Sequence, residues 1–290
     1  MHFKGTYTAL ITPFYRDESV DFDALEQLVE RQIEVGVEGI VPVGTTGESP
    51  TLRPDEHLKV IERVVRVSAG RCKVIAGTGA NSTAEAVELT LAAKAFGVDG
   101  TLQVTPYYNK PNDKGLICHF SAVADLGVPV VLYNVPGRTS REIPISVVAE
   151  LAQHPHVVSV KEAAGSVERV SEILNVCSLE VLSGDDVLAV PMIEAGACGV
   201  ISVASNVIPR QLSEMIRTAL AGKMDEARVI HQQWAPLFDD LFIDTNPIPV
   251  KAAAAMLGMA DEVYRLPLCP MQSALRDQLQ QTMIKLGMLG

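Results

Sequence analysis

The chain of 290 residues is long enough for one barrel or for two ordinary domains, and its net charge of −11 argues against a phosphate-backbone partner such as nucleic acid. A composition that is 48% hydrophobic but only 5% aromatic indicates an aliphatic α/β core and excludes a platform for stacking bases. The five cysteines are scattered without a CxxC spacing, and no apolar run approaches a membrane span, so we expect a cytoplasmic protein without structural zinc.

A repeating unit organises residues 1–222, in which a helix ends on glycine, a short link follows, and an apolar strand begins. The link is visible at Gly36, Gly97, Gly127 and Gly196. The predicted strands span residues 6–12, 40–44, 73–77, 101–105, 130–133, 157–161, 180–183 and 200–203.

Between these strands lie amphipathic segments with apolar residues at helical spacing. Ser82 and Glu85 have the spacing of a capping box, and Pro54 and Pro144 suit first-turn positions. The predicted helices span residues 22–35, 55–67, 83–96, 115–126, 145–153, 167–177, 187–195 and 211–221. This alternation predicts a closed (β/α)8 TIM barrel over residues 1–222 rather than an open doubly wound sheet.

Residues 223–290 contain no strand-like run and form a predicted C-terminal helical subdomain. Its helices are expected near residues 225–240, 249–257 and 272–286. No flexible linker or charged tail separates this part from the barrel, so we expect a small helical layer that packs against it.

Lys161 stands out because it ends an apolar, β-branched run. Such a run indicates a strand buried on both faces, which places Lys161 at the rim where parallel barrels collect their reactive groups. Partial desolvation there favours the free amine that attacks carbonyls. The alternative is that Lys161 extends to solvent or pairs with Glu162. Lys251 is the other conspicuous lysine, but it falls in the helical subdomain.

The residues after the other predicted strands supply hydroxyls, phenols, glycines and an arginine, but no histidine. This inventory favours carbonyl chemistry through an imine over metal-assisted hydrolysis, and the pairing of Lys161 with Tyr133 on the adjacent strand is its most specific element. The glycines and threonines at residues 44–48 have two interpretations. They serve only to form a turn, or their N–H and hydroxyl groups bind a small carboxylate.

Two further positions on this rim have competing interpretations. Arg138 follows a Pro-Gly turn and is either a surface arginine or a bidentate ligand for a carboxylate. The adjacent Asp185 and Asp186 lack a third ligand for a divalent ion, so we expect them to cap the helix that follows the seventh strand.

Ordered motifs over essentially the whole chain resemble the dihydrodipicolinate synthase family, within the pyruvate-dependent Schiff-base aldolases and lyases. They lie at residues 44–48, 76–79, 106–109, 133–138, 160–162, 183–186 and 246–251. The resemblance implies a lyase without metal or cofactor that condenses pyruvate with L-aspartate 4-semialdehyde, in the biosynthesis of diaminopimelate and lysine.

The resemblance also implies roles for individual residues. Lys161 would form the imine with pyruvate, while Tyr133, Thr45 and a Tyr108 supplied by the neighbouring subunit would relay protons. The implied substrate-binding residues are Thr46 for the pyruvate carboxylate, Arg138 for the carboxylate of the aldehyde, Gly184 and Val203.

A homotetramer of two dimers and feedback inhibition by L-lysine are implied as well. The positions that match the family's lysine site are Ser49, His57, Asn81, Glu85 and Tyr107. Pro54 departs from the pattern, because lysine-sensitive relatives often carry a histidine there, so we expect inhibition of altered affinity.

Two other functions remain open. One is a pyruvate aldolase that acts on a longer sugar acid or another aldehyde, although Arg138 directly after its turn favours the synthases. The other is a catalytically silent keto-acid-binding homologue. The complete set of Lys161, Tyr133, Thr45 and Tyr108 argues against the silent homologue, because a binding protein needs no proton relay.

Overall fold

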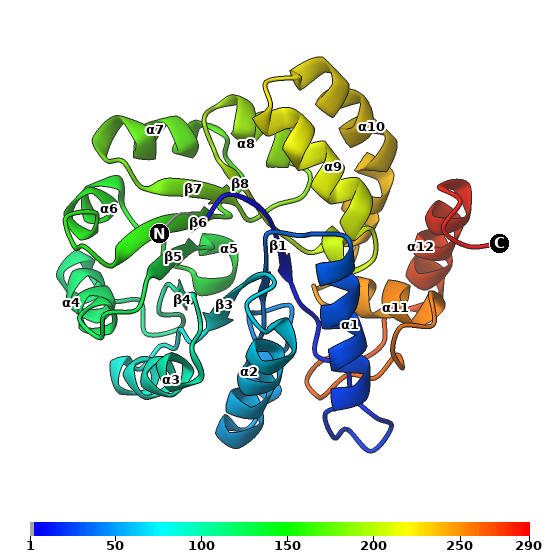
Figure 1. The fold of residues 1–290 in the computed structure, drawn as a ribbon, viewed down its shortest axis with the longest axis horizontal. Coiled ribbons are helices and arrows are strands. Elements are labelled where there is room, and N and C mark those ends of the chain that lie inside the picture. Colours follow the sequence, from blue (N-terminus) through cyan, green and yellow to red (C-terminus); the bar gives the residue numbers. More distant parts are fainter. Residues whose placement is uncertain (1–2) are drawn as a thin grey trace.

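The computed structural model describes residues 3–290 and shows a closed barrel of parallel strands surrounded by helices (Figure 1). The strands pair in chain order, and the last returns to the first, with Thr6 opposite Val200. Their bounds are β1 Gly5–Ala9, β2 Gly39–Val41, β3 Lys73–Gly77, β4 Gly100–Val104, β5 Val130–Asn134, β6 Val157–Glu162, β7 Glu180–Ser183 and β8 Gly199–Ser202. The predicted (β/α)8 fold is confirmed.

The helices that alternate with these strands form an outer ring around the barrel (Figure 1). They are α1 Phe22–Glu34, α2 Pro54–Ser68, α3 Thr83–Phe96, α4 Asp113–Ala124, α6 Ile145–Leu151, α7 Glu168–Val176, α8 Ala189–Glu194 and α9 Pro209–Leu220. Shorter turns lie on the rim at η1 Ser49–Thr51, α5 Pro136–Thr139 and η2 Ala204–Asn206.

Some local predictions at the ends of elements are wrong. Ser82 precedes α3 as its N-cap, but its side chain makes no capping hydrogen bond. Pro54 is the first residue of α2, as predicted, whereas Pro144 lies one residue before α6 in an extended conformation. The first strand ends at Ala9 instead of residue 12, because the N–H of Ile11 donates to the side chain of Asn206, at 3.1 Å, rather than to a neighbouring strand.

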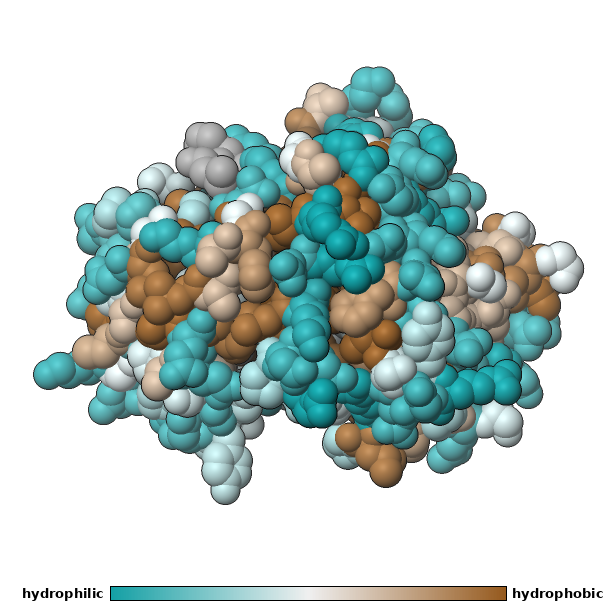
Figure 2. All heavy atoms as spheres, turned by 60° about the horizontal axis from the view of Figure 1, so that its bottom comes forward, coloured by the Kyte–Doolittle hydropathy of each residue, from teal (hydrophilic) through white to brown (hydrophobic). Residues whose placement is uncertain are grey.

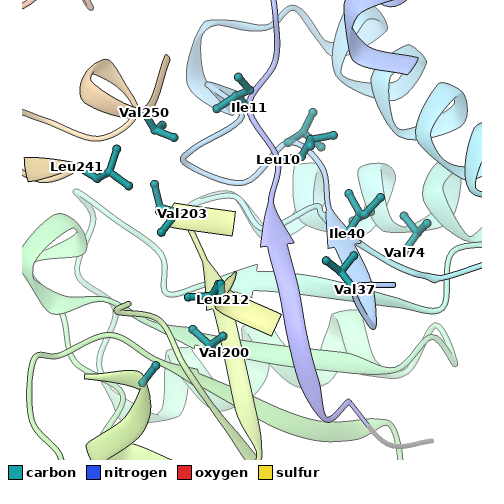
Figure 3. Packing of buried hydrophobic residues seen from close by; sticks show 14 of the residues in the cluster. Leu10, Ile11, Val37, Ile40, Val74, Val200, Val203, Leu212, Leu241 and Val250 are labelled. Carbon is teal, nitrogen blue, oxygen red and sulfur yellow. The ribbon is translucent and has the colours of Figure 1, made fainter. Parts of the chain in front are cut away.

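Two hydrophobic clusters fill the fold. The larger one lies between the strands and the helices, and Figure 3 shows part of it, including Leu10, Ile40, Val200 and Leu212. The smaller one fills the barrel, where Phe3 and Tyr7 are fully buried and meet edge to face with ring centroids 6.0 Å apart. Because these rings come from the first strand and the residues before it, they close the end of the barrel at which the strands begin.

The C-terminal layer consists of α10 Met224–Asp240, α11 Ile248–Met256 and α12 Ser273–Lys285, which lie together on one side of the barrel (Figure 1). Trp234, Leu237 and Phe238 of α10 belong to the same hydrophobic cluster as the barrel's outer face. The layer is therefore packed on the barrel, as expected, and the division of the chain at residue 222 stays a prediction.

The surface mixes hydrophilic and hydrophobic side chains, with the hydrophobic ones gathered into a few patches on the face shown in Figure 2. Across residues 3–290, none of the helices combines the length and the apolar character that crossing a bilayer demands.

Arg265 attaches the chain between α11 and α12 to the barrel. Its guanidinium forms a bidentate pair with Glu56 of α2, at 2.7 and 2.8 Å, and it donates to the carbonyls of Glu18 and Thr51. It also lies over the ring of Phe14, with Cζ 4.5 Å from the centroid. Hydrogen bonding by Arg265 lowers the pKa of Glu56 to about 2.

We expect Glu56→Gln to lower the free energy of unfolding by about 1–2 kcal/mol near neutral pH, a figure reduced for solvent screening. The pKa of Glu56 is lower in the folded state, so this contribution is present above about pH 5 and is lost as the pH falls toward about 2. Urea midpoints of the two proteins should therefore converge on acidification.

The control is Glu214→Gln on the exposed face of α9, because Glu214 forms no ion pair with the part of the chain that the structure describes. The urea midpoint of this variant should differ little from that of the parent at every pH. A difference for Glu56→Gln that stayed constant with pH would exclude the Arg265 pair as its source.

Candidate active site

Lys161 carries a buried amine. It lies on β6 beside Tyr133 of β5, and its side chain is only 6% exposed. The Nζ atom is 4.1 Å from the centroid of the Tyr133 ring, and within residues 3–290 it takes part in no ion pair or hydrogen bond. The predicted juxtaposition of the two residues is confirmed, and the alternative in which Lys161 extends into solvent is wrong.

Glu162 does not pair with Lys161, because its carboxylate is already bound. It accepts hydrogen bonds from Nδ2 of Asn134 at 2.8 Å and from Nε of Arg169 at 3.0 Å. Burial raises the pKa of Glu162, and the charge of Arg169 acts in the opposite direction. Successive residues of a strand point to opposite faces, so the side chains of Lys161 and Glu162 lie on opposite faces of β6.

Gly184, just after β7, leaves space for Lys161. A Cβ atom at this position would lie 3.1 Å from Cε of Lys161 and 2.5 Å from Cβ of Ala163. The next residue, Asp185, has its pKa raised by burial, while the charge of Lys161 lowers it. The sequence interpretation gave Asp185 no role near the amine, because adjacent aspartates usually cap helices.

Asp186 caps a different turn from the one predicted. Its carboxylate accepts the N–H groups of Val203 and Ala204, at 3.0 and 2.8 Å, and so holds η2 after β8 rather than α8. The predicted helix cap is therefore wrong. Across residues 3–290, no cluster of three or more His, Cys, Asp or Glu side chains is arranged to hold a metal ion.

The turn after β2 presents polar groups to the same rim. It is tightly folded, with Gly47 and Glu48 donating their N–H groups to the carbonyls of Gly44 and Thr45 at 3.1 and 3.0 Å. The N–H groups of Thr45 and Thr46 meet no acceptor in residues 3–290. Two adjacent N–H groups that remain free, next to two hydroxyls, are suited to bind a small carboxylate.

Residues of the C-terminal layer form hydrogen bonds and an ion pair with this turn. Asn246 donates from Nδ2 to Oγ1 of Thr46 at 3.0 Å, and its carbonyl accepts from Nη2 of Arg138 at 3.1 Å. Lys251 of α11 pairs with Glu48, Nζ to Oε1 at 2.5 Å, and both side chains are almost completely buried. The sequence did not predict the contacts of Asn246 with Thr46 and of Lys251 with Glu48, because the segments that meet here lie about 200 residues apart.

The lysine-site prediction concerns a neighbouring cavity of about 600 Å³. Its lining includes Ser49, His57, Glu85 and Tyr107 together with Pro54, Thr45 and Arg138. Asn81 does not line it, but donates to the carbonyl of Tyr107 at 3.2 Å. The structure therefore brings most of the predicted set together, while Lys161 and Tyr133 lie outside the lining.

His57 is a neutral imidazole in the wall of this cavity. Its Nε2 lies 2.8 Å from the carbonyl oxygen of Gly77, which can only accept, so Nε2 carries the proton and donates. Burial lowers the pKa of His57. Its Nδ1 is then the acceptor of the ring.

Two predicted residues do not contribute their side chains to the rim of their own chain. Tyr108 is 91% exposed and has a left-handed backbone with φ 73°, so its ring extends away from the barrel. The side chain of Val203 packs in the outer hydrophobic cluster (Figure 3). A substrate contact by Val203 would have to come from its backbone.

Comparison with known proteins gives one consistent result. A model of the dihydrodipicolinate synthetase family matches residues 2–286. The 4-hydroxy-tetrahydrodipicolinate synthase of Pelobacter propionicus is 49% identical over 290 residues, covering 99% of this chain and 100% of the relative.

Two solved structures share the fold throughout. The chloride-inhibited dihydrodipicolinate synthase of Acinetobacter baumannii, complexed with pyruvate, is 42% identical with a TM-score of 0.97. The structure of DHDPS from Cyanidioschyzon merolae with lysine bound is 41% identical with a TM-score of 0.96. Each comparison covers 99% of both chains.

The two buried lysines should respond differently to loss of their charge. We expect Lys251→Met to destabilise the fold by about 3–5 kcal/mol, because it leaves the Glu48 carboxylate buried without its partner. The double variant Lys251→Met with Glu48→Gln should recover part of this loss. Urea unfolding measures both.

Lys161→Met is the matched control, since Lys161 is also buried but has no ion pair within residues 3–290. We expect its urea midpoint to change little. Equal losses in the two single variants would mean that the Glu48 pair does not distinguish the lysines.

Proposed function

Because this chain belongs to the dihydrodipicolinate synthetase family of pyruvate-dependent lyases, we propose that it is a 4-hydroxy-tetrahydrodipicolinate synthase. Its substrates are pyruvate and L-aspartate 4-semialdehyde, and its product feeds the synthesis of diaminopimelate and lysine in the cytoplasm. The observation that carries this proposal is the buried, unpaired amine of Lys161 against the ring of Tyr133, at the rim of the barrel.

The amine of Lys161 attacks the carbonyl carbon of pyruvate, and loss of water gives the imine. The imine is an electron sink, so the methyl group of pyruvate loses a proton at neutral pH and becomes a nucleophilic enamine. The enamine attacks the aldehyde carbon, and the amine of the aldehyde substrate then displaces Lys161 as the ring closes. Tyr133 and Thr45 relay the protons, so that no cofactor or metal takes part.

The two substrates are oriented by their carboxylates. Thr46 and the free N–H groups of its turn receive the carboxylate of pyruvate, as their geometry supports. Arg138 receives the carboxylate of the aldehyde, since its contact with the carbonyl of Asn246 leaves most of its donors free. Gly184 keeps the space beside Lys161 open for the reacting carbons.

The proton relay is completed by another copy of the chain. Tyr108 is almost fully exposed and is directed away from its own barrel, which supports its insertion into the site of a neighbouring subunit. A tetramer built from two such dimers is the assembly we propose. In that assembly a large exposed aromatic side chain becomes buried, as expected at an interface.

L-lysine is the proposed inhibitor of this synthase. A relative at 41% identity is described with lysine bound, and His57, Glu85 and Tyr107 line the cavity beside Thr45 and Arg138. Glu85 supplies a negative charge for an ammonium group of the ligand. Pro54 in the same lining removes a side chain that could donate, so the affinity is altered rather than abolished.

The imine is tested by borohydride reduction in the presence of pyruvate, followed by intact mass and peptide mapping. We expect one reduced pyruvate adduct, on Lys161, and no adduct in Lys161→Ala. A variant Lys251→Met that remains folded should retain the adduct. Trapping that persisted in Lys161→Ala would assign the imine to another lysine.

The same preparation separates the synthase from its alternatives through turnover of L-aspartate 4-semialdehyde. An adduct with semialdehyde turnover supports the synthase, and an adduct without it indicates an aldolase for another aldehyde. The absence of any adduct would contradict pyruvate imine chemistry altogether.

Lysine inhibition is tested by initial rates across a lysine titration. We expect Glu85→Gln to raise the half-inhibitory concentration about tenfold, the loss of roughly 1.4 kcal/mol from a charged hydrogen bond. Glu88→Gln, on the same helix and in the same cavity lining, controls for the loss of a negative charge. Initial rates that lysine does not change in the parent enzyme would contradict the regulatory site.

A further inference from the structure

We propose that Asn246 is a positioning residue that fixes the direction of the Thr46 hydroxyl for binding the pyruvate carboxylate. This inference rests on the proposed function. Asn246 lies in the turn between α10 and α11, its side chain is 6% exposed, and its Nδ2 is 3.0 Å from Oγ1 of Thr46.

The chemistry of the two groups sets the direction of this hydrogen bond. An amide nitrogen can only donate, so Oγ1 of Thr46 is the acceptor and its own hydrogen must point elsewhere. Within residues 3–290 that hydrogen meets no acceptor. The Thr46 hydroxyl is thus held as a donor toward the position of the substrate carboxylate before the substrate binds.

The orientation of the Asn246 amide decides which of the two side chains donates in this contact. As the structure has it, Oδ1 of Asn246 is buried without a partner within residues 3–290. Reversing the amide would make Oδ1 the acceptor of the Thr46 hydroxyl, and that hydroxyl could then no longer donate to a substrate. A buried unpaired polar group costs about 1–3 kcal/mol, and the one hydrogen bond of this buried side chain is the one that Nδ2 donates to Thr46.

The backbone of Asn246 also contacts Arg138, the residue proposed to bind the second substrate. Its carbonyl accepts from Nη2 of Arg138 at 3.1 Å, so one residue contacts both groups that bind carboxylates. The buried pair of Lys251 with Glu48 fixes the same turn two residues after Thr46. The turn between α10 and α11 therefore sets the spacing between the two carboxylate sites.

The test is Asn246→Asp, in which the new carboxylate can accept but not donate, so that the Thr46 hydroxyl turns toward it. We expect the pyruvate concentration for half-maximal borohydride trapping to rise at least about tenfold, equivalent to about 1.4 kcal/mol. The KM for the aldehyde and kcat at saturating pyruvate should change little.

Asn112→Asp is the matched control for the added charge. Asn112 is the exposed N-cap of α4, where its side chain accepts from the N–H of Gly115, and a carboxylate does this equally well. We expect the parent's pyruvate dependence in this variant. If Asn246→Asp does not fold, Asn246→Ala replaces it, with an expected rise of about threefold because the hydroxyl is no longer held.

A double-mutant cycle with Thr46→Val separates positioning from a general structural role. If Asn246 acts through the hydroxyl, its substitution should change pyruvate binding less than about twofold in the Thr46→Val background. Thr46→Ser, which keeps the hydroxyl, should restore the full sensitivity to Asn246→Asp.

Additive effects of Asn246→Asp and Thr46→Val, or an unchanged pyruvate dependence in Asn246→Asp, would overturn this inference. These outcomes differ from a failure of the proposed function. In that case the parent protein itself would form no pyruvate adduct.

Discussion

The parallel pairing of β1 with β8 is the constraint on which the rest of the structure depends. It brings the two most distant strands of the barrel together, with Gly5 opposite Gly199. A Cβ atom at residue 199 would lie 2.1 Å from the carbonyl oxygen of Gly5, so this seam requires glycine. Once it is closed, the carboxyl ends of all strands share one rim, which carries both Thr45 and Lys161.

Two lysine side chains are buried, and the surroundings of their amines differ. Lys251 faces a buried carboxylate and the ring of Phe14, 4.2 Å from Nζ, and so serves to attach the C-terminal layer. Lys161 has an aromatic ring but no carboxylate in contact. The two amines thus differ in their partners, because Lys251 has a carboxylate within hydrogen-bond distance whereas Lys161 forms no ion pair within residues 3–290.

Local sequence signals predicted the fold nearly residue by residue where neighbours in the chain decide the structure. The bounds predicted for β3, β7 and α3 agree with the structure. The spacing of apolar residues and the glycines at element ends are signals from neighbouring residues, and they suffice to set these bounds. The end of β1 and the partners of Asp186 were predicted incorrectly, because side chains from distant segments provide the hydrogen bonds there. The contact of Asn246 with Thr46 also joins distant segments of the chain, and no local sequence pattern predicts it.

The attachment of the turn after β2 to the turn between α10 and α11 has a consequence for the order in which the protein matures. Thr46 and Glu48 leave the ribosome about 200 residues before the partners that hold them, Asn246 and Lys251. In a nascent chain with all strands of the barrel paired, this turn would still lack both contacts. The turn after β2 therefore reaches its final form only when the last helices dock, after every strand of the barrel has been synthesised.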